Sequence, residues 1–356
     1  MRTIENVIAS IPLNPSKPVA DSVKARWDSL TKPRGSLGRL EDAVVQLAVI
    51  QDTPAPRVER RGMYVFCGDH GITTEGVSPY PSVVTREMVK NFLRGGAAIN
   101  VLCRQLAIET CIVDAGVAGP KISGALDRRI AEGTRNFLQE PAMSREQAIT
   151  AMERGIELAY DAAGKFDLAG IGEMGIGNST AASALLCAFT GLSAEQSAGR
   201  GAGLDEAGLL HKRQVLTGAL ARCRIHADDP LNTVAELGGF EIAMMAGFLL
   251  GAAANKLPVI VDGFISGAAF LIARAFYAEI GSHVLFAHRS AERGHAALLA
   301  AVGASPLLDL DMRLGEGTGA ALAIGLLTSA VHLYREMATF EEASVSDMEG
   351  KGANDR

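Results

Sequence analysis

The sequence has 356 residues, of which 48% are hydrophobic and 21% charged, and its 40 acidic and 34 basic residues give a net charge of -6. This length can form one large core or two unequal domains. The acidic balance, without a basic stripe interleaved with aromatic residues, argues against a nucleic-acid partner. No apolar stretch approaches the roughly 20 residues of a membrane helix and no apolar signal region is visible, so we expect neither a membrane partner nor secretion. The five cysteines form no CxxC pair, which is typical of free thiols in a reducing cytoplasm.

Short β-branched or apolar segments recur along the chain, and each is followed by a glycine or acidic turn and then by a helical pattern. This alternation predicts an α/β fold with a doubly wound, mostly parallel six-stranded sheet. In such sheets ligands bind beyond the carboxyl ends of the strands, so we expect the unusual polar residues at those ends to form one site. The six expected strands are residues 63–67, 110–113, 168–171, 259–261, 284–287 and 306–308.

The two ends of the chain have a different pattern. The first 50 or so residues and the segment after Thr328 lack strand signals and have helical periodicity. We expect these segments to pack together beside the sheet. The predicted organisation is a large α/β catalytic domain at residues 26–327 and a small helical domain formed by residues 1–25 and 328–356.

The first expected strand leads into two polar segments. Asp69 and His70 could begin a metal site, but no second and third ligand follow at helical or hairpin spacing, so a structural histidine is the favoured interpretation. Tyr80 then lies on a loop that two prolines stiffen. It could form the wall of an aromatic-substrate site, or it could be ordinary loop packing.

The glycine-rich segment Gly172–Thr180 is the best candidate for an anion site. Its glycines free the backbone, and Asn178 can cap the following helix, whose exposed N–H groups would bind a carboxylate or phosphate. The spacing GxxGxG differs from the GxGxxG of dinucleotide-binding enzymes, so a nicotinamide or flavin dinucleotide is not favoured.

Three later positions are candidates for phosphate or ribose binding. Lys212 follows a glycine-rich turn and could bind a phosphate, although a solvated helix lysine would have the same pattern. The pair Asp262-Gly263 and the residue Ser290 follow the next two strands, where a ribose or phosphate could be held.

The segment Arg313–Ala320 places one carboxylate, Glu316, between glycines just before an apolar helix. The glycines let the backbone approach a bound molecule, and a helix N-terminus favours the ionised form of a nearby carboxylate. Glu316 is therefore a candidate general base. A capping acid at the start of a glycine-rich helix is the alternative that this segment leaves open.

Taken together, these segments resemble those of the nicotinate-nucleotide–dimethylbenzimidazole phosphoribosyltransferases, a family that makes the lower-ligand nucleotide of cobalamin. The resemblance covers nearly the whole chain. It is carried by residues 30–41, 68–71, 92–99, 113–118, 172–178, 313–319 and 337–343.

The resemblance implies a Rossmann-like six-stranded domain, a small helical domain built from both termini, and a homodimer. It also implies transfer of the phosphoribosyl group of nicotinate mononucleotide to 5,6-dimethylbenzimidazole, which gives α-ribazole 5′-phosphate and nicotinate. Because this reaction releases no pyrophosphate, we expect no cofactor and no essential metal. Glu316 matches the catalytic glutamate of the family and Glu173 a second, supporting glutamate. The implied substrate-binding residues are Tyr80, Glu87, Gly175, Gly177, Asn178, Gly201, Lys212, Asp262, Gly263, Ser290 and Leu314.

The sequence departs from the family pattern around the expected base pocket. Relatives usually have Ser-Ala-Tyr/Phe-Pro-Gln where this chain has Pro79 and Ser82, and a glutamine where it has Glu87. A carboxylate only accepts hydrogen bonds, whereas an amide can also donate them. These departures leave open the same reaction with adenine, another benzimidazole or a phenolic base. A nicotinamide-dependent oxidoreductase and a non-catalytic nucleotide-binding protein are the rival classes, but the first lacks its fingerprint and the second would not need Glu316.

Overall fold

The computed structural model describes residues 3–12, 16–223 and 229–346. Within these residues, six parallel strands form one sheet in the order β3-β2-β1-β4-β5-β6. From β1 the chain first adds β2 and β3 on one side and then β4, β5 and β6 on the other, as in doubly wound dinucleotide-binding folds. This strand order confirms the predicted fold class. The strands are β1 (Arg61–Gly68), β2 (Glu109–Gly116), β3 (Leu126–Asp127), β4 (Leu168–Met174), β5 (Val259–Val261) and β6 (Val284–Phe286).

One of the expected strands is absent and one short strand was not expected. The prediction of a strand at residues 306–308 is wrong, because only Leu308 pairs with the neighbouring chain, through an isolated parallel bridge to His288. The amides of Leu307 and Leu308 donate to carbonyls at the end of β6, and the chain then leaves the sheet. The sixth strand is instead β3, whose two residues are too few to show a periodic pattern.

Helices cover both faces of the sheet, and each face has its own core. Along β1, Tyr64 and Phe66 face the core that contains α6 and α11, whereas Met63 and Val65 face the core that contains α3, α5 and α14. This alternation follows from the two-residue period of a strand and explains why β1 is apolar throughout. These helices are α3 (Arg39–Ile50), α5 (Ala98–Gln105), α6 (Arg145–Lys165), α11 (Phe240–Ala254) and α14 (Thr318–Glu336).

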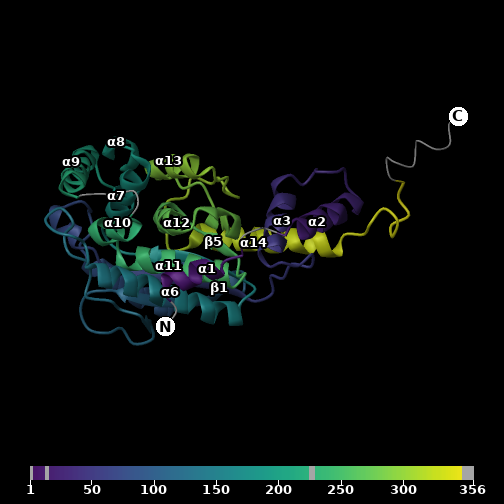
Figure 1. Cartoon of the computed structure of the whole chain (residues 1–356), viewed down its shortest axis with the longest axis horizontal. Coiled ribbons are helices and arrows are strands. Elements are labelled where there is room, and N and C mark those ends of the chain that lie inside the picture. The colour runs from purple at the N-terminus through teal and green to yellow at the C-terminus, as the bar shows by residue number, and fades with distance from the viewer. Residues whose placement is uncertain (1–2, 13–15, 224–228, 347–356) are drawn as a thin grey trace.

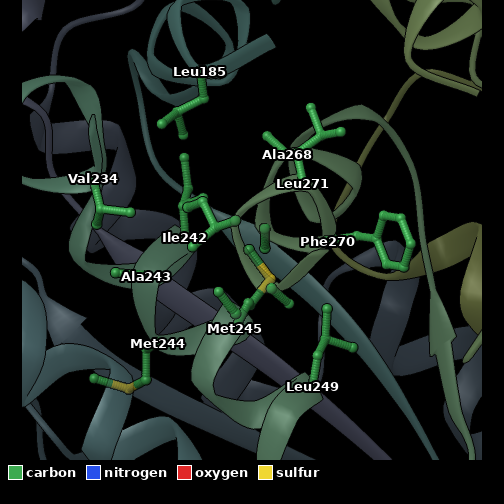
Figure 2. Packing of buried hydrophobic residues seen from close by; sticks show 14 of the residues in the cluster. Leu185, Val234, Ile242, Ala243, Met244, Met245, Leu249, Ala268, Phe270 and Leu271 are labelled. Carbon is green, nitrogen blue, oxygen red and sulfur yellow. The ribbon is translucent and has the colours of Figure 1, made fainter. Parts of the chain in front are cut away.

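The helix α11 is apolar around its whole circumference and lies in the middle of the first core. Every side chain from Phe240 to Ala253 is buried, as expected for a helix without a polar face. Figure 2 shows Leu185, Ile242 and Leu271, from three different helices, gathered in this core. In the described part of the chain, no helix combines the length and apolarity needed to cross a bilayer.

The remaining helices surround this frame. Among them, α4 begins after the loop that follows β1, and α7, α9, α12 and α13 begin near the carboxyl ends of β4 to β6. Short 3₁₀ helices are η1 (Gly71–Glu75) and η2 (Ala278–His283). The other α-helices are α1 (Ile4–Ser10), α2 (Lys17–Ser29), α4 (Val83–Arg94), α7 (Asn178–Thr190), α8 (Ala194–Ser197), α9 (Glu206–Arg222), α10 (Pro230–Leu237), α12 (Phe264–Phe276) and α13 (Arg293–Val302).

The two terminal regions meet at one end of the molecule, where α2, α3 and the end of α14 lie together (Figure 1). The Trp27 ring lies 5.2 Å from that of Tyr334, and Leu30 forms an antiparallel bridge with Thr339. In contrast, α1 packs against α6 and α11 in the other core. The division at residues 1–25 and 328–356 stays a prediction, and the parts at 1–2, 13–15 and 347–356 lie outside the described residues.

Candidate active site

A cavity of about 430 Å³ opens at the carboxyl ends of β4, β5 and β6. Parallel strands bring the residues that follow them to one edge of the sheet, so segments far apart in sequence share this cavity. Of the site residues predicted from the sequence, only Glu87 and Lys212 do not line it. The predicted residues that line it are Tyr80, Glu173, Gly175, Gly177, Asn178, Gly201, Asp262, Gly263, Ser290, Leu314 and Glu316.

Three buried carboxyl groups meet in the inner part of the cavity. Glu173 lies at the end of β4, Asp262 directly after β5, and Glu316 just before α14. A Cβ atom added to Gly172 would lie 2.3 Å from the backbone nitrogen of Gly317. Glycine is therefore required at position 172, because it lets the two glutamate-bearing segments touch.

The environment of Glu173 favours its protonated form. Burial first, and then the negative charge of Asp262, raise the pKa of Glu173 to about 8, although a hydrogen bond from the Asn178 side chain opposes the shift. A carboxyl group with this pKa is mostly neutral at pH 7. Glu173 can then donate a hydrogen bond as well as accept one.

Glu316 has a strained backbone and a different partner. Its φ is +62°, in the left-handed region that non-glycine residues rarely adopt. One carboxylate oxygen, Oε2, accepts a hydrogen bond of 3.3 Å from the backbone N–H of Ile99, in the first turn of α5. Such strain is often retained where a side chain has to be held toward a ligand.

The helix whose N-terminal amide supports the ionised form of Glu316 is thus α5, whereas the sequence suggested α14. Burial raises the pKa of Glu316, and the charge of Asp262 adds to this, while the Ile99 N–H opposes it. A helix N-terminus therefore favours the ionised form of Glu316, as expected, but loss of water around the carboxylate outweighs this one hydrogen bond.

The carboxylate of Asp262 has partners within the protein. Its Oδ1 atom accepts a 2.8 Å hydrogen bond from the backbone N–H of Ala320, in the first turn of α14. The Nδ1 atom of His288 lies 3.7 Å from the same oxygen. Burial raises the pKa of Asp262, whereas His288 and the α14 amides lower it. Asp262 therefore caps α14 and fixes the start of the helix behind Glu316.

A second polar region lies beside the carboxyl groups and contains the buried lysine. The Nζ atom of Lys212, on α9, donates a 2.9 Å hydrogen bond to the Ser179 hydroxyl, which lines the cavity. Only 1% of Lys212 is exposed, which excludes the alternative of a solvated helix lysine. Burial lowers the pKa of Lys212 to about 8, and Glu292 opposes that shift. A buried ammonium group with one neutral partner is suited to binding an anion.

Sequence reasoning did not select several residues that line the cavity. His288 and Glu292 flank Ser290 after β6, Ser179 follows Asn178, and Arg313 begins the Glu316 segment. The signal for His288 and Arg313 was their position in strand-end motifs. No local pattern distinguishes Glu292, whose pKa is raised by burial and lowered by Lys212, from a solvated acid.

The mouth of the cavity is apolar and open. Tyr80 and Leu314 are 51% and 58% exposed, and Val84 and Met88 line the same region from α4. Glu87 lies one residue before Met88 but is exposed and does not line the cavity. Its predicted contact with a substrate base stays a prediction.

Comparison with known proteins gives matches along almost the whole chain. A family model described as a phosphoribosyltransferase matches residues 13–345. A nicotinate-nucleotide–dimethylbenzimidazole phosphoribosyltransferase of Geobacter sp. (strain M21) is 46% identical over 353 residues, which are 97% of this chain and 100% of that protein. A protein of the same name from Cupriavidus taiwanensis is 52% identical over 329 residues, 91% of this chain and 94% of that protein. The crystal structure of CobT from Thermus thermophilus superimposes with a TM-score of 0.88 at 44% identity, covering 92% of this chain and 99% of that chain.

Proposed function

This chain belongs to the nicotinate-nucleotide–dimethylbenzimidazole phosphoribosyltransferase family, and from that premise we propose that it transfers phosphoribose from nicotinate mononucleotide to 5,6-dimethylbenzimidazole. The products are α-ribazole 5′-phosphate and nicotinate, in the assembly of the nucleotide loop of cobalamin. The observation that carries the proposal is the cavity itself, which has buried carboxyl groups, an apolar mouth and a buried cation that contacts its lining at Ser179.

The polar region around Lys212 suits the 5′-phosphate. Lys212 supplies a positive charge, Ser290 lies across the cavity, and the glycine turn at Gly201 brings backbone close to Ser179. Phosphate binding by an ammonium group, a hydroxyl and backbone amides is common, because each can donate to the oxygens of the dianion. In this pose C1 of the ribose faces the carboxyl groups.

The reaction replaces the pyridinium ring at C1 by the benzimidazole and ends with a proton transfer to Glu316. The bond between C1 and the pyridinium nitrogen breaks, and its electron pair neutralises the departing ring, so the leaving group needs no acid. The benzimidazole N3 forms the new bond to C1 on the opposite face, which gives the α product. The N–H of the attacking ring becomes acidic as the bond forms, and a carboxylate held nearby accepts that proton.

The two glutamates divide the roles according to their surroundings. Glu316 accepts a helix N–H, which supports the ionised form that a base requires, whereas the pKa of Glu173 is about 8. Burial raises the pKa of both groups, but only Glu316 accepts a helix N–H that lowers its pKa. We assign the base role to Glu316 and the donor role, toward ribose or nicotinate, to Glu173.

The apolar mouth is assigned to the acceptor base. Tyr80, Met88 and Leu314 offer flat and flexible apolar surface to an aromatic ring. The homodimer and the cytoplasmic location are also proposals, supported by the family resemblance and by the free thiols of a chain with a net charge of -6.

The test is a competition assay with the purified protein. Nicotinate mononucleotide is supplied with equal amounts of 5,6-dimethylbenzimidazole, adenine and a phenol, and the products are separated and identified by mass. The proposal predicts that nicotinate is released only when a base is present and that the dimethylbenzimidazole nucleotide predominates. A dominant adenine or phenolic product would reassign the acceptor, and nicotinate release without any nucleotide product would contradict the transfer.

A further inference from the structure

A buried histidine–glutamate pair outside the cavity connects the first strand to the core helix α11. His70 follows β1, Glu241 lies in the first turn of α11, and their side chains are both 0% exposed. The Nε2 atom of His70 lies 2.6 Å from Oε1 of Glu241. Neither residue lines the cavity, and the assignments above give neither a role.

Such a pair is a poor way to stabilise a core. Removing two ionisable groups from water is costly, and a well-packed apolar pair of similar volume is often at least as stable. Its presence among the apolar side chains of α11 therefore calls for a reason other than stability. The position of the pair supplies that reason.

The pair lies directly beneath the glycine segment 172–177. A Cβ atom on Gly175 would lie 3.4 Å from Oε1 of Glu241 and 3.4 Å from Cδ2 of His70. On the other side, a Cβ atom on Gly239 would lie 2.4 Å from Cε1 of His70 and 2.7 Å from Oε2 of Glu241. The two side chains therefore fill the space between the glycine segment and the start of α11.

The position of the glycine segment determines where the side chains at its two ends lie. Glu173 stands at its start, and Asn178, which donates to Glu173, follows at its end. Between them, the backbone N–H of Ile176 donates to the Thr85 hydroxyl at 3.0 Å. Thr85 anchors the segment from α4, and the pair supports it from below. Movement at Gly175 would change how Glu173 faces Asn178 and the Glu316 segment.

We propose that His70 and Glu241 are positioning residues for the transfer reaction, which hold the glycine segment 172–177 and thereby fix Glu173 beside Glu316. The proposal rests on the function assigned above. It predicts that the pair affects turnover and the protonation of Glu173, and not only the stability of the fold.

The positioning role is read from kcat against KM and from rescue by His70→Gln, and the charge of Glu241 gives a second readout, the electrostatic coupling of the pair to Glu173. Glu241 is one of the negative groups that raise the pKa of Glu173, so removing its charge while keeping its shape should lower that pKa. The titratable or charged groups that face Glu173 are Asp262 from the turn after β5, Glu316 from the segment before α14, Cys67 from β1 and Glu241 from α11.

The decisive variants are Glu241→Gln and His70→Gln, because each keeps an atom that can form the hydrogen bond. Glu241→Leu and His70→Leu remove the bond, and Met244→Ala is the matched control that disturbs α11 without touching the pair. We expect the leucine variants to lose between about 10- and 100-fold in kcat with little change in KM, as expected for misplacement of about 1 Å at a catalytic group. His70→Gln should recover most of this loss.

The protonation of Glu173 is followed by infrared spectroscopy, as the carboxylic-acid band that disappears in Glu173→Gln. This measurement needs no turnover, so it remains informative whether or not the wild-type protein releases nicotinate. In Glu241→Gln the band should titrate at lower pH than in wild type, and in Met244→Ala it should titrate as in wild type. Wild-type kcat in Glu241→Leu and His70→Leu, with a lowered melting temperature, would show that the pair is structural only, whichever way the band of Glu241→Gln titrates. Failure of the wild-type protein to release nicotinate would instead contradict the proposed function.

Discussion

The inner part of the cavity and its mouth differ in the type and the exposure of their side chains. The inner part is lined by the buried carboxyl groups of Glu173, Asp262 and Glu316, which strand ends and helix N-termini fix, and the buried Lys212 lies beside it and donates to Ser179. The mouth consists of exposed apolar side chains, with Tyr80 on a proline-containing loop. Buried charges require specific partners, whereas apolar contacts tolerate exchange of similar groups.

Because the two parts differ in this way, we expect the inner part to determine the chemical step and the mouth to determine which acceptor base is used. Substitutions in the inner part should act on turnover or nucleotide affinity, and substitutions at the mouth should act on which base is used.

Replacing Glu316 by glutamine should have the largest effect. The substitution preserves size and backbone but removes the proton acceptor, so turnover should fall by roughly 10²–10⁴-fold while both substrates still bind. Nicotinate release and a thermal melt of the same preparation measure the two consequences. If Glu316 were a capping acid, the variant would instead lose about 1 kcal/mol of stability and keep near-normal turnover.

Replacing Lys212 by alanine should act on affinity rather than on the chemical step. A hydrogen bond to a charged group contributes about 1.5–3 kcal/mol, so KM for nicotinate mononucleotide should rise roughly 10- to 100-fold. KM for the base should change little. Lys121→Ala is the control, because that lysine is 79% exposed and far from the cavity lining. Equal KM values in Lys212→Ala and wild type would remove the lysine from the phosphate site.

Replacing Glu173 by glutamine should matter less at neutral pH than at alkaline pH. Glutamine resembles the protonated acid, so turnover at pH 7 should fall by at most about 10-fold. In the wild-type protein the pKa of Glu173 is about 8, and above it an additional negative charge appears beside Asp262 and Glu316. Wild-type turnover should therefore decline above about pH 8, and the variant should lack that decline. A decline of the same size in both proteins would assign it to another group.

The raised pKa of Glu173 also predicts how stability depends on pH. An unfolded glutamate releases its proton near pH 4.5, whereas folded Glu173 keeps it to about pH 8. The stability that this group contributes is thus fully present below pH 4.5 and is lost as the pH rises toward 8. Thermal melts between pH 5 and 8 should show a smaller loss in Glu173→Gln than in wild type.

Substitutions at the mouth should have the smallest effect on rate and a selective effect on product. Met88→Ala removes apolar surface that lines the cavity, and it should shift the ratio of products in a mixed-base competition by up to about 10-fold. Glu87→Gln, on the exposed side of α4, tests the predicted contact of Glu87 with the base, and it should shift the ratio less than Met88→Ala does. A larger shift from Glu87→Gln than from Met88→Ala would place the base on the other side of that helix.

Much of the fold could be predicted from the sequence, because the central strands are apolar runs bounded by glycine or acidic turns. The five strands β1, β2, β4, β5 and β6 were expected at nearly their observed positions. The strand β3 has two residues, and its pairing depends on β2 rather than on its own composition. Likewise, only tertiary contacts decide that α1 packs against α11 and not beside α2.

The site was predictable where it follows strand ends and unpredictable where it depends on distant partners. Asp262 and Ser290 could be found because each follows a strand of a parallel sheet, whereas Glu173, inside the last residues of β4, was identified through the family resemblance. The contact between Ile99 and Glu316 joins residues 217 positions apart, and no local pattern contains it. The burial of Lys212 and Glu292 likewise arises only when α9 and α13 pack beside α7 and α8.

The meeting of α2 and α3 with the end of α14 has a consequence for biosynthesis. Arg26 donates to the carbonyl of Arg335, and these residues are 309 positions apart. At about 5–20 residues per second, the ribosome needs roughly 15–60 s to make the chain between them. During that interval Trp27 and Leu30 lack the surface that covers them in the finished protein. The nascent N-terminal helices therefore expose an apolar face until translation is almost complete, which makes this stage the one at which chaperones are most needed.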